Sequence, residues 1–161
     1  MRTSRKPSSL IDNPFNRVTN VTKGGSPSNK ISSVPVNLKG RSILFVEDDV
    51  FNQQLTGLIL SRCGCYLAIA AHGGEALDLI MKRRFDLVLM DIGMPVMDGV
   101  QTTRIIREEL GITTPVIAIT GDVHHEDLRR YRQAGINAHL AKPYNQQQLL
   151  SMIANVVGPF K

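Results

Sequence analysis

The sequence contains no apolar stretch long enough to cross a membrane. Its 161 residues are 42% hydrophobic, yet no run approaches the roughly 18 consecutive apolar residues of a transmembrane helix. A compact apolar segment of the signal-peptide type is also missing near Met1. We therefore expect a soluble cytoplasmic protein that does not associate with membranes.

Cysteine is scarce, which argues against a structural metal site. Cys63 and Cys65 are the only two in the chain. Structural zinc needs four ligands, and His124 and His125 do not have the spacing to complete a site with this Cys-x-Cys pair. Nothing in the nearby sequence activates either thiol as a nucleophile. We expect two reduced cysteines at a junction between a helix and a strand.

Acidic residues are nearly absent from the first 40 positions, where Asp12 stands against seven Lys or Arg. The net charge of +5 therefore belongs to this segment, because the remainder has 12 basic and 13 acidic residues. The segment also lacks any apolar period and cannot offset the entropy cost of ordering. We expect residues 1–38 to be a disordered basic tail or linker, and residues 39–161 to form one domain.

Two special functions of this tail remain open alternatives to a plain linker. Its Arg-rich, Ser-rich and acid-poor composition overlaps with that of organelle transit peptides, but Pro7 and Pro14 would interrupt the amphipathic helix that such peptides form. A basic tail can also bind nucleic acid through its charge alone. We favour the plain linker and expect no nucleic-acid partner.

Short apolar runs alternate with amphipathic segments from Ser42 onward. The expected strands are Ser42–Val46, Tyr66–Ala70, Asp86–Met90, Pro115–Ile119 and Asn137–Ala141. The expected helices are Val50–Arg62, a segment following Gly73 and Gly74, Gly99–Leu110, Val123–Gln133 and Asn145–Val157. Nearly continuous apolar strands indicate a parallel sheet that is covered by helices on both faces. The pattern predicts an α/β fold with a doubly wound, five-stranded parallel sheet and five helices.

Polar residues stand at the ends of four of these strands. They are the acidic run Glu47, Asp48 and Asp49, then Asp91, Thr120 and Lys142. The carboxyl ends of parallel strands share one rim of the sheet, and ligands bind on that rim where the strand order reverses. We expect these side chains to converge. Taken alone, the acidic run could instead cap the helix that follows it, because Asp favours that position.

Several carboxylates in one place favour a bound cation. Two like charges ~4 Å apart repel by about 4 kcal/mol at an intermediate dielectric, and an oxygen-only ligand set is typical of Mg²⁺. Asp91, in the middle, is then placed as a carboxylate nucleophile toward phosphorus. Lys142 and Thr120 supply a positive charge and a hydroxyl for the oxygens of the transferred group. The pattern predicts the formation of an acyl phosphate.

Four motifs carry a resemblance to a known family. They are VEDD (46–49), MDIGMPVMDG (90–99), AIT (118–120) and AKP (141–143). Over residues 41–158 the chain resembles the response-regulator receiver domains of two-component signalling. The resemblance implies that Asp91 is the phosphoacceptor. It also implies a Mg²⁺ site formed by Asp48, Asp49, Asp91 and the main-chain carbonyl of Gly93, with Asp49 as the most direct ligand.

The resemblance implies further roles. Thr120 is the switch hydroxyl, Lys142 pairs with the phosphoryl group, and the Lys142–Pro143 bond is expected to be cis. The strand order implied is 2-1-3-4-5, as in flavodoxin-like folds. His139 occupies the switch position at which the family usually has Tyr or Phe. It is either a pH-sensitive switch residue or a polar surface residue on an edge strand, and we favour the second interpretation.

The function we expect is a phosphorelay. VEDDVFNQ (46–53) resembles receivers of hybrid histidine kinases, with residues 1–40 as a linker. The partner is then a histidine kinase or a histidine-containing phosphotransfer protein, which docks near Val50, Phe51 and Leu55. We expect a signalling phosphoacceptor rather than an enzyme. The alternatives are a stand-alone receiver that works through protein binding and an interaction module that does not need phosphate. A second copy of the domain is a further candidate partner, in a homodimer through the fourth helix, fifth strand and last helix.

Overall fold

The computed structural model describes residues 36–158, whose centre is a five-stranded parallel sheet. The strands are β1 (Ser42–Val46), β2 (Tyr66–Ala70), β3 (Leu87–Asp91), β4 (Val116–Thr120) and β5 (Ala138–Ala141). Their order is β2-β1-β3-β4-β5, and each neighbouring pair is parallel. The predicted α/β class and strand order are confirmed.

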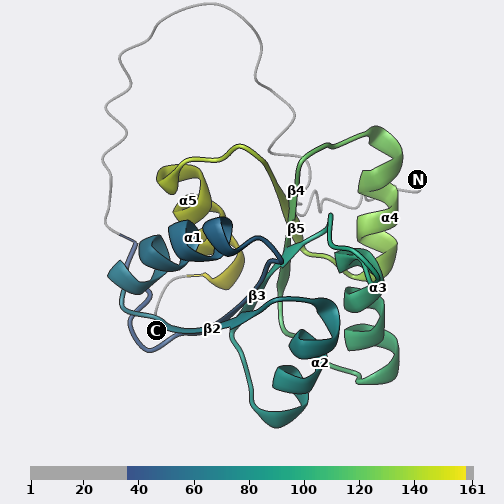
Figure 1. Cartoon of the computed structure of the whole chain (residues 1–161), viewed down its shortest axis with the longest axis horizontal. Coiled ribbons are helices and arrows are strands. Elements are labelled where there is room, and N and C mark those ends of the chain that lie inside the picture. Colours follow the sequence, from purple (N-terminus) through teal and green to yellow (C-terminus); the bar gives the residue numbers. More distant parts are fainter. Residues whose placement is uncertain (1–35, 159–161) are drawn as a thin grey trace, which may run out of the picture.

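Helices cover both faces of the sheet (Figure 1). They are α1 (Val50–Arg62), α2 (Gly73–Lys82), α3 (Gly99–Arg104), the π-helical turn η2 (Ile105–Glu109), α4 (His125–Ala134) and α5 (Gln146–Val157). α1 and α5 lie on one face, whereas α2, α3 and α4 lie on the other. Within residues 36–158, no helix combines the length and the apolar character that a membrane span requires.

Each face of the sheet has its own apolar core. Every residue of β3 and β4 is buried, which explains why these strands read as unbroken apolar runs. Met90, Ile106 and Tyr131 belong to the core beneath α2, α3 and α4. Phe45 and Leu60 belong to the core beneath α1 and α5. Each large apolar side chain buried in this way contributes about 1.5–3 kcal/mol, so the cores hold the site residues at the strand ends rigidly.

The packed domain begins earlier than the predicted boundary at residue 39. Leu38 is only 2% exposed, and Val36 packs against the same core. The backbone N–H of Leu38 donates to the carbonyl of Cys63 at 3.0 Å. Val36 and Leu38 alternate with Asn37, but this stretch is too short to be recognised as an element from the sequence. Val36 and Leu38 of the expected tail thus pack against the domain, and residues 1–35 of that tail lie outside the described part of the chain.

The two cysteines lie at the junction of α1 and β2 and are free. Their thiols donate to backbone carbonyls, Cys63 to Ile59 at 3.4 Å and Cys65 to Leu60 at 3.2 Å. Burial raises the pKa of both thiols. A raised pKa disfavours the reactive thiolate, which agrees with the prediction that neither cysteine is a nucleophile.

The predicted helix over Gly99–Leu110 is present but changes character at Ile105. There the backbone widens into a π-helical turn, in which the N–H of Leu110 donates to the carbonyl of Ile105 at 3.0 Å. Gly111 follows with φ of 63°, a conformation that glycine adopts without steric cost. Gly135 ends α4 in the same way, with φ of 85°.

Candidate functional site

The site residues converge on the rim formed by the carboxyl ends of the strands. Asp91 is the last residue of β3 and Thr120 the last residue of β4, while Lys142 follows β5 directly. Glu47 and Asp48 come directly after β1. Because β1, β3 and β4 are neighbours in the sheet, residues that are far apart in sequence meet at one edge, as the parallel topology predicts.

Three carboxylates form the acidic group of this rim. One oxygen from each of Glu47, Asp48 and Asp91 lies within 4.8 Å of the other two. Glu47 is 1% exposed and Asp91 5%, whereas Asp48 is open to solvent. The backbone N–H of Gly93 donates to Oδ1 of Asp91 at 3.1 Å. An oxygen-only donor set with one exposed member fits a hard cation such as Mg²⁺.

The acidic group differs from the expected one at Asp49. Its Oδ1 accepts a hydrogen bond from the backbone N–H of Asn52 at 2.8 Å and caps the N-terminus of α1. Glu47 takes its place in the group, because it is the first residue after β1 and turns inward. The preference of Asp for helix N-caps was the signal in the sequence that pointed to this division.

Lys142 links two of the carboxylates. Its Nζ lies 3.0 Å from Oε2 of Glu47 and 3.3 Å from Oδ2 of Asp91. Burial alone would lower the pKa of Lys142, but the hydrogen bond to Glu47 and the charge of Asp91 raise it above its ordinary value. Burial raises the pKa of Glu47, against the opposing effect of Lys142. The lysine is therefore a fixed positive charge beside Asp91, and its bond to Pro143 is cis, as expected.

Thr120 is held away from solvent by two neighbours. Its hydroxyl donates to the carbonyl of Asp122 at 2.7 Å, and it lies 3.3 Å from the hydroxyl of Tyr131 on α4. Thr120 is 5% exposed and Tyr131 2%. Tyr131 was not singled out in the sequence, because its position in the helical period indicates only a core residue.

His139 is buried, so the interpretation as a polar surface residue is wrong. It is 5% exposed, and it pairs with Ala118 in the sheet register. It shares the sheet face that α4 covers, which protects a residue of the edge strand from solvent. Burial and the nearby charge of Arg132 lower the pKa of His139. The imidazole is consequently neutral at neutral pH.

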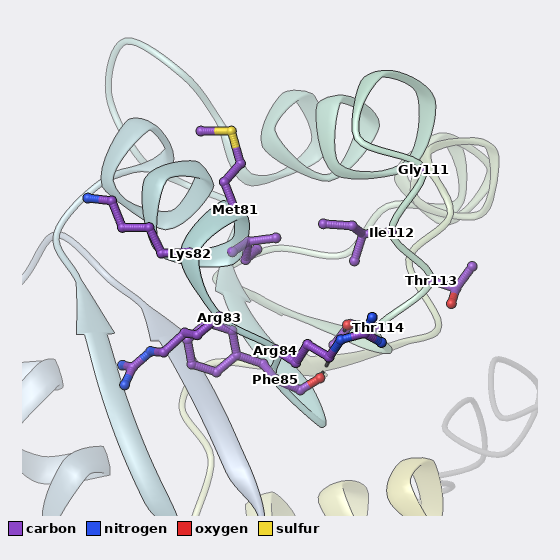
Figure 2. Close-up of a pocket in the computed structure, with 10 residues that line it drawn as sticks. Met81, Lys82, Arg83, Arg84, Phe85, Gly111, Ile112, Thr113 and Thr114 are labelled. Atoms are coloured by element: carbon purple, nitrogen blue, oxygen red, sulfur yellow. Dashed lines mark hydrogen bonds between the residues drawn. The ribbon is translucent and has the colours of Figure 1, made fainter.

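A pocket lies away from this rim (Figure 2). It has a volume of ≈ 540 Å³ and is lined by residues that precede β3 and β4, such as Phe85 and Thr114. In Figure 2 the charged ends of Lys82 and Arg83 extend away from Ile112, so the cations do not meet at one point. The pocket contains none of the predicted site residues.

A comparison with known protein families identifies the family of this chain. Residues 43–154 match the family model of the response regulator receiver domain. The chain belongs to the response regulator receiver domain family. Receiver domains are signalling phosphoacceptors of two-component systems, and the site residues of this receiver lie within or beside the matched segment.

Similar receivers occur in proteins of different length. Transcription factor SKN7 of Saccharomyces cerevisiae is 42% identical over 115 residues, which are 71% of this chain and 18% of that protein. The two-component response regulator ARR22 of Arabidopsis thaliana is 33% identical over 138 residues, 84% of this chain and 96% of that protein. For the first curated relatives that it matches, which are all SKN7 proteins, the chain spans less than a quarter of their length.

Solved structures support the same fold. The chemotaxis protein CheY4 of Vibrio cholerae has a TM-score of 0.70 and 30% identity, and the match covers 73% of this chain and 98% of that one. The receiver domain of the sensor histidine kinase PA1611 from Pseudomonas aeruginosa has a TM-score of 0.68 and 36% identity over 74% and 99% of the two chains. That structure contains a magnesium ion in its active-site cleft.

The buried His139 predicts a stability that depends on pH. Its pKa in the folded chain lies below the ordinary 6.5, so the unfolded chain binds a proton first as the pH falls. The stability that the neutral histidine confers is complete above about pH 6.5 and declines below it, by at most about 1.4 kcal/mol per pH unit for one proton. Urea unfolding at a series of pH values measures this slope.

His139→Phe should flatten the acid side of that profile, because the variant has nothing to protonate at this position. The control His125→Gln changes an exposed histidine and should keep the native slope. If the His139→Phe profile ran parallel to the native one, burial of a neutral imidazole would not be the source of the pH dependence.

Proposed function

We propose that this receiver domain accepts a phosphoryl group on Asp91 from a phosphohistidine of a partner protein. The observation that carries the proposal is the arrangement of the buried Asp91 carboxylate. The backbone of Gly93 donates to one of its oxygens, and Lys142 lies beside the other. A nucleophile held in this way is already oriented for attack on phosphorus, so little entropy is lost when the donor arrives.

The transfer breaks one bond and forms another. A carboxylate oxygen of Asp91 bonds to phosphorus, the bond between phosphorus and the imidazole nitrogen breaks, and the imidazole leaves. Asp48, Asp91 and the carbonyl of Gly93 would hold a Mg²⁺ ion, which supplies positive charge to the phosphoryl oxygens when bound. The ammonium of Lys142 adds a second positive charge to the same oxygens, and Glu47 keeps that ammonium in place.

Hydrolysis resets the domain. A water oxygen attacks phosphorus, inorganic phosphate leaves, and the carboxylate of Asp91 is restored. Gly121, the residue after Thr120, has no side chain, and a Cβ at this position would meet nothing within 4 Å. This open approach supports access of water to the phosphoryl group.

Asp91→Asn tests the phosphoacceptor. The amide keeps the shape of the side chain but is a poor nucleophile toward phosphorus, so labelling by the small donor phosphoramidate should be lost. The label on the native chain should also be acid-labile in the manner of an acyl phosphate. Persistent labelling of Asp91→Asn at an acid-stable residue would contradict the assignment.

Asp48→Asn and Asp49→Asn form a matched pair for the metal site. Asp48 lies in the three-carboxylate group, and we expect its loss to weaken Mg²⁺ binding about tenfold or more. Asp49 caps α1, and Asn caps a helix as well as Asp does, so its variant should bind Mg²⁺ within about twofold of the native chain. Titration with Mg²⁺, followed by nuclear magnetic resonance, measures both. Equal losses of Mg²⁺ affinity in the two variants would mean that Asp49 is also a ligand.

The exposed face of α1 is the docking surface that we propose for the partner. Val50 is 63% exposed, Phe51 70% and Leu55 52%, which is unusual for large apolar residues that lie close together. A pocket of ≈ 490 Å³ adjoins Leu55, and Tyr144 is also among its lining residues. α1 begins at the acidic rim, so a protein bound here can bring its histidine toward Asp91.

Phe51→Ala tests this surface. Removing a central aromatic anchor should slow phosphoryl transfer from histidine kinases and histidine-containing phosphotransfer proteins about tenfold or more. The control Met81→Ala changes another exposed apolar residue, 61% exposed, which lines the pocket away from the rim. It should transfer at the native rate. Equal transfer rates in the two variants would contradict the proposal that α1 is the docking surface.

Forward and reverse transfer distinguish the two uses of the phosphoryl group. Fast return to a phosphotransfer protein indicates a relay, which the similarity of this chain to histidine kinases supports. A long-lived phosphoform indicates a terminal switch. An interaction module that does not need phosphate is not favoured, because it would need neither the acidic group nor the paired lysine. The cytoplasmic location and the homodimer stay predictions.

A further inference from the structure

The hydrogen-bonding capacity of the Thr120 hydroxyl is filled in this structure. A hydroxyl has one proton and two lone pairs, and the proton is donated to the carbonyl of Asp122 at 2.7 Å. The hydroxyl of Tyr131, 3.3 Å away, therefore donates to Oγ1 of Thr120. The backbone N–H of Asp122 approaches the same oxygen at 3.4 Å. Thr120 must break one of these contacts before its proton can turn toward another acceptor.

Tyr131 depends on Thr120 in return. It is among the largest fully buried side chains of the described residues, and burial raises the pKa of its hydroxyl while the bond to Thr120 opposes the rise. The hydroxyl is thus protonated and remote from water. A buried donor that loses its acceptor is costly, because water cannot replace the bond. A movement of Thr120 therefore changes the hydrogen bonding of Tyr131 on α4.

His139 of β5 lies at a different level of the sheet from Thr120. His139 pairs with Ala118 in the register, whereas Thr120 pairs with Ala141. The histidine therefore lies two residues before the level of Thr120, and Tyr131 reaches the threonine from α4 instead. Arg130, the residue before Tyr131 in α4, forms an ion pair with Asp98 at 2.7 Å. That ion pair is half-exposed and correspondingly weak, so the buried hydroxyl pair is the stronger tie between α4 and the rim.

We propose that Tyr131 is the positioning residue that holds Thr120 in the unphosphorylated arrangement and transmits its movement to α4. The inference rests on the proposed phosphorylation of Asp91. When Asp91 carries a phosphoryl group, the Thr120 hydroxyl donates to a phosphoryl oxygen and gives up the carbonyl of Asp122. To reach that oxygen, Oγ1 of Thr120 moves away from the hydroxyl of Tyr131. Tyr131 then loses its acceptor, and α4 shifts until the hydroxyl finds another. The phosphoryl group changes the equilibrium only through its different contacts in the two states.

A double-mutant cycle on the full chain tests this link. The four proteins are the native chain, Tyr131→Phe, Thr120→Ala and the double variant. The first readout is the initial rate of Asp91 labelling by phosphoramidate with Mg²⁺. The second is the shift of α4 backbone amides in nuclear magnetic resonance when beryllofluoride, a phosphoryl mimic, is added. Tyr66→Phe, which removes the hydroxyl of a tyrosine that is 72% exposed, is the control and should match the native chain.

Tyr131→Phe keeps the ring but releases Thr120, so we expect labelling to become about fivefold faster, the equivalent of one lost hydrogen bond. The α4 shifts on addition of beryllofluoride should shrink, because α4 is no longer tied to Thr120. In the Thr120→Ala background, Tyr131→Phe should change neither readout, because the acceptor is already gone.

Two results would overturn the proposal. One is a Tyr131→Phe variant with the native labelling rate and native α4 shifts. The other is an effect of Tyr131→Phe that is as large in the Thr120→Ala background as in the native chain, which would mean that the tyrosine acts through packing alone. If the native chain itself were not labelled at Asp91, the proposed function would fail instead, and the two failures are thus distinct.

Discussion

Lys142 places one positive charge between two buried carboxylates, Glu47 at 3.0 Å and Asp91 at 3.3 Å. Without that charge, two nearly inaccessible acids would face each other at the end of a buried sheet, and an unpaired buried charge is strongly unfavourable. The fold brings the three side chains together at the carboxyl ends of β1, β3 and β5. The parallel order of the strands is therefore what makes the site possible, because it aligns their carboxyl ends on one rim.

The same rim connects chemistry with the surface of the domain. Thr120 ends β4 beside this rim, and its hydroxyl contacts both the loop before α4 and Tyr131 within α4. On the other side, Lys142 leads into the Pro143 and Tyr144 segment that faces α1. We expect a change at Asp91 to reach two helices that lie on opposite faces of the sheet, α4 and α1 (Figure 1). Rigid cores on both faces transmit such shifts because they do not deform continuously.

The sequence predicted most of the fold and the residues that meet at the strand ends, because both follow from short, strong patterns. Unbroken apolar runs identify buried parallel strands, and the polar residue at each strand end is visible directly. Three consecutive carboxylates, however, have the same chemistry, and only the end of β1 and the start of α1 separate Glu47 from the helix cap Asp49. The burial of His139 and the role of Tyr131 depend on how α4 packs over the sheet. The positive φ of Val96, 68°, is likewise uncommon for a β-branched residue and has no sequence signal.

The central claim is that Asp91 forms an acyl phosphate, and chemical trapping tests it most directly. Borohydride reduces an aspartyl phosphate to homoserine, which peptide mass spectrometry locates in the chain. After incubation with phosphoramidate and Mg²⁺, followed by reduction, the account predicts homoserine at position 91 and unmodified aspartate at positions 48 and 49. Homoserine at another acidic residue, or none in a chain that nevertheless carries the label, would contradict it.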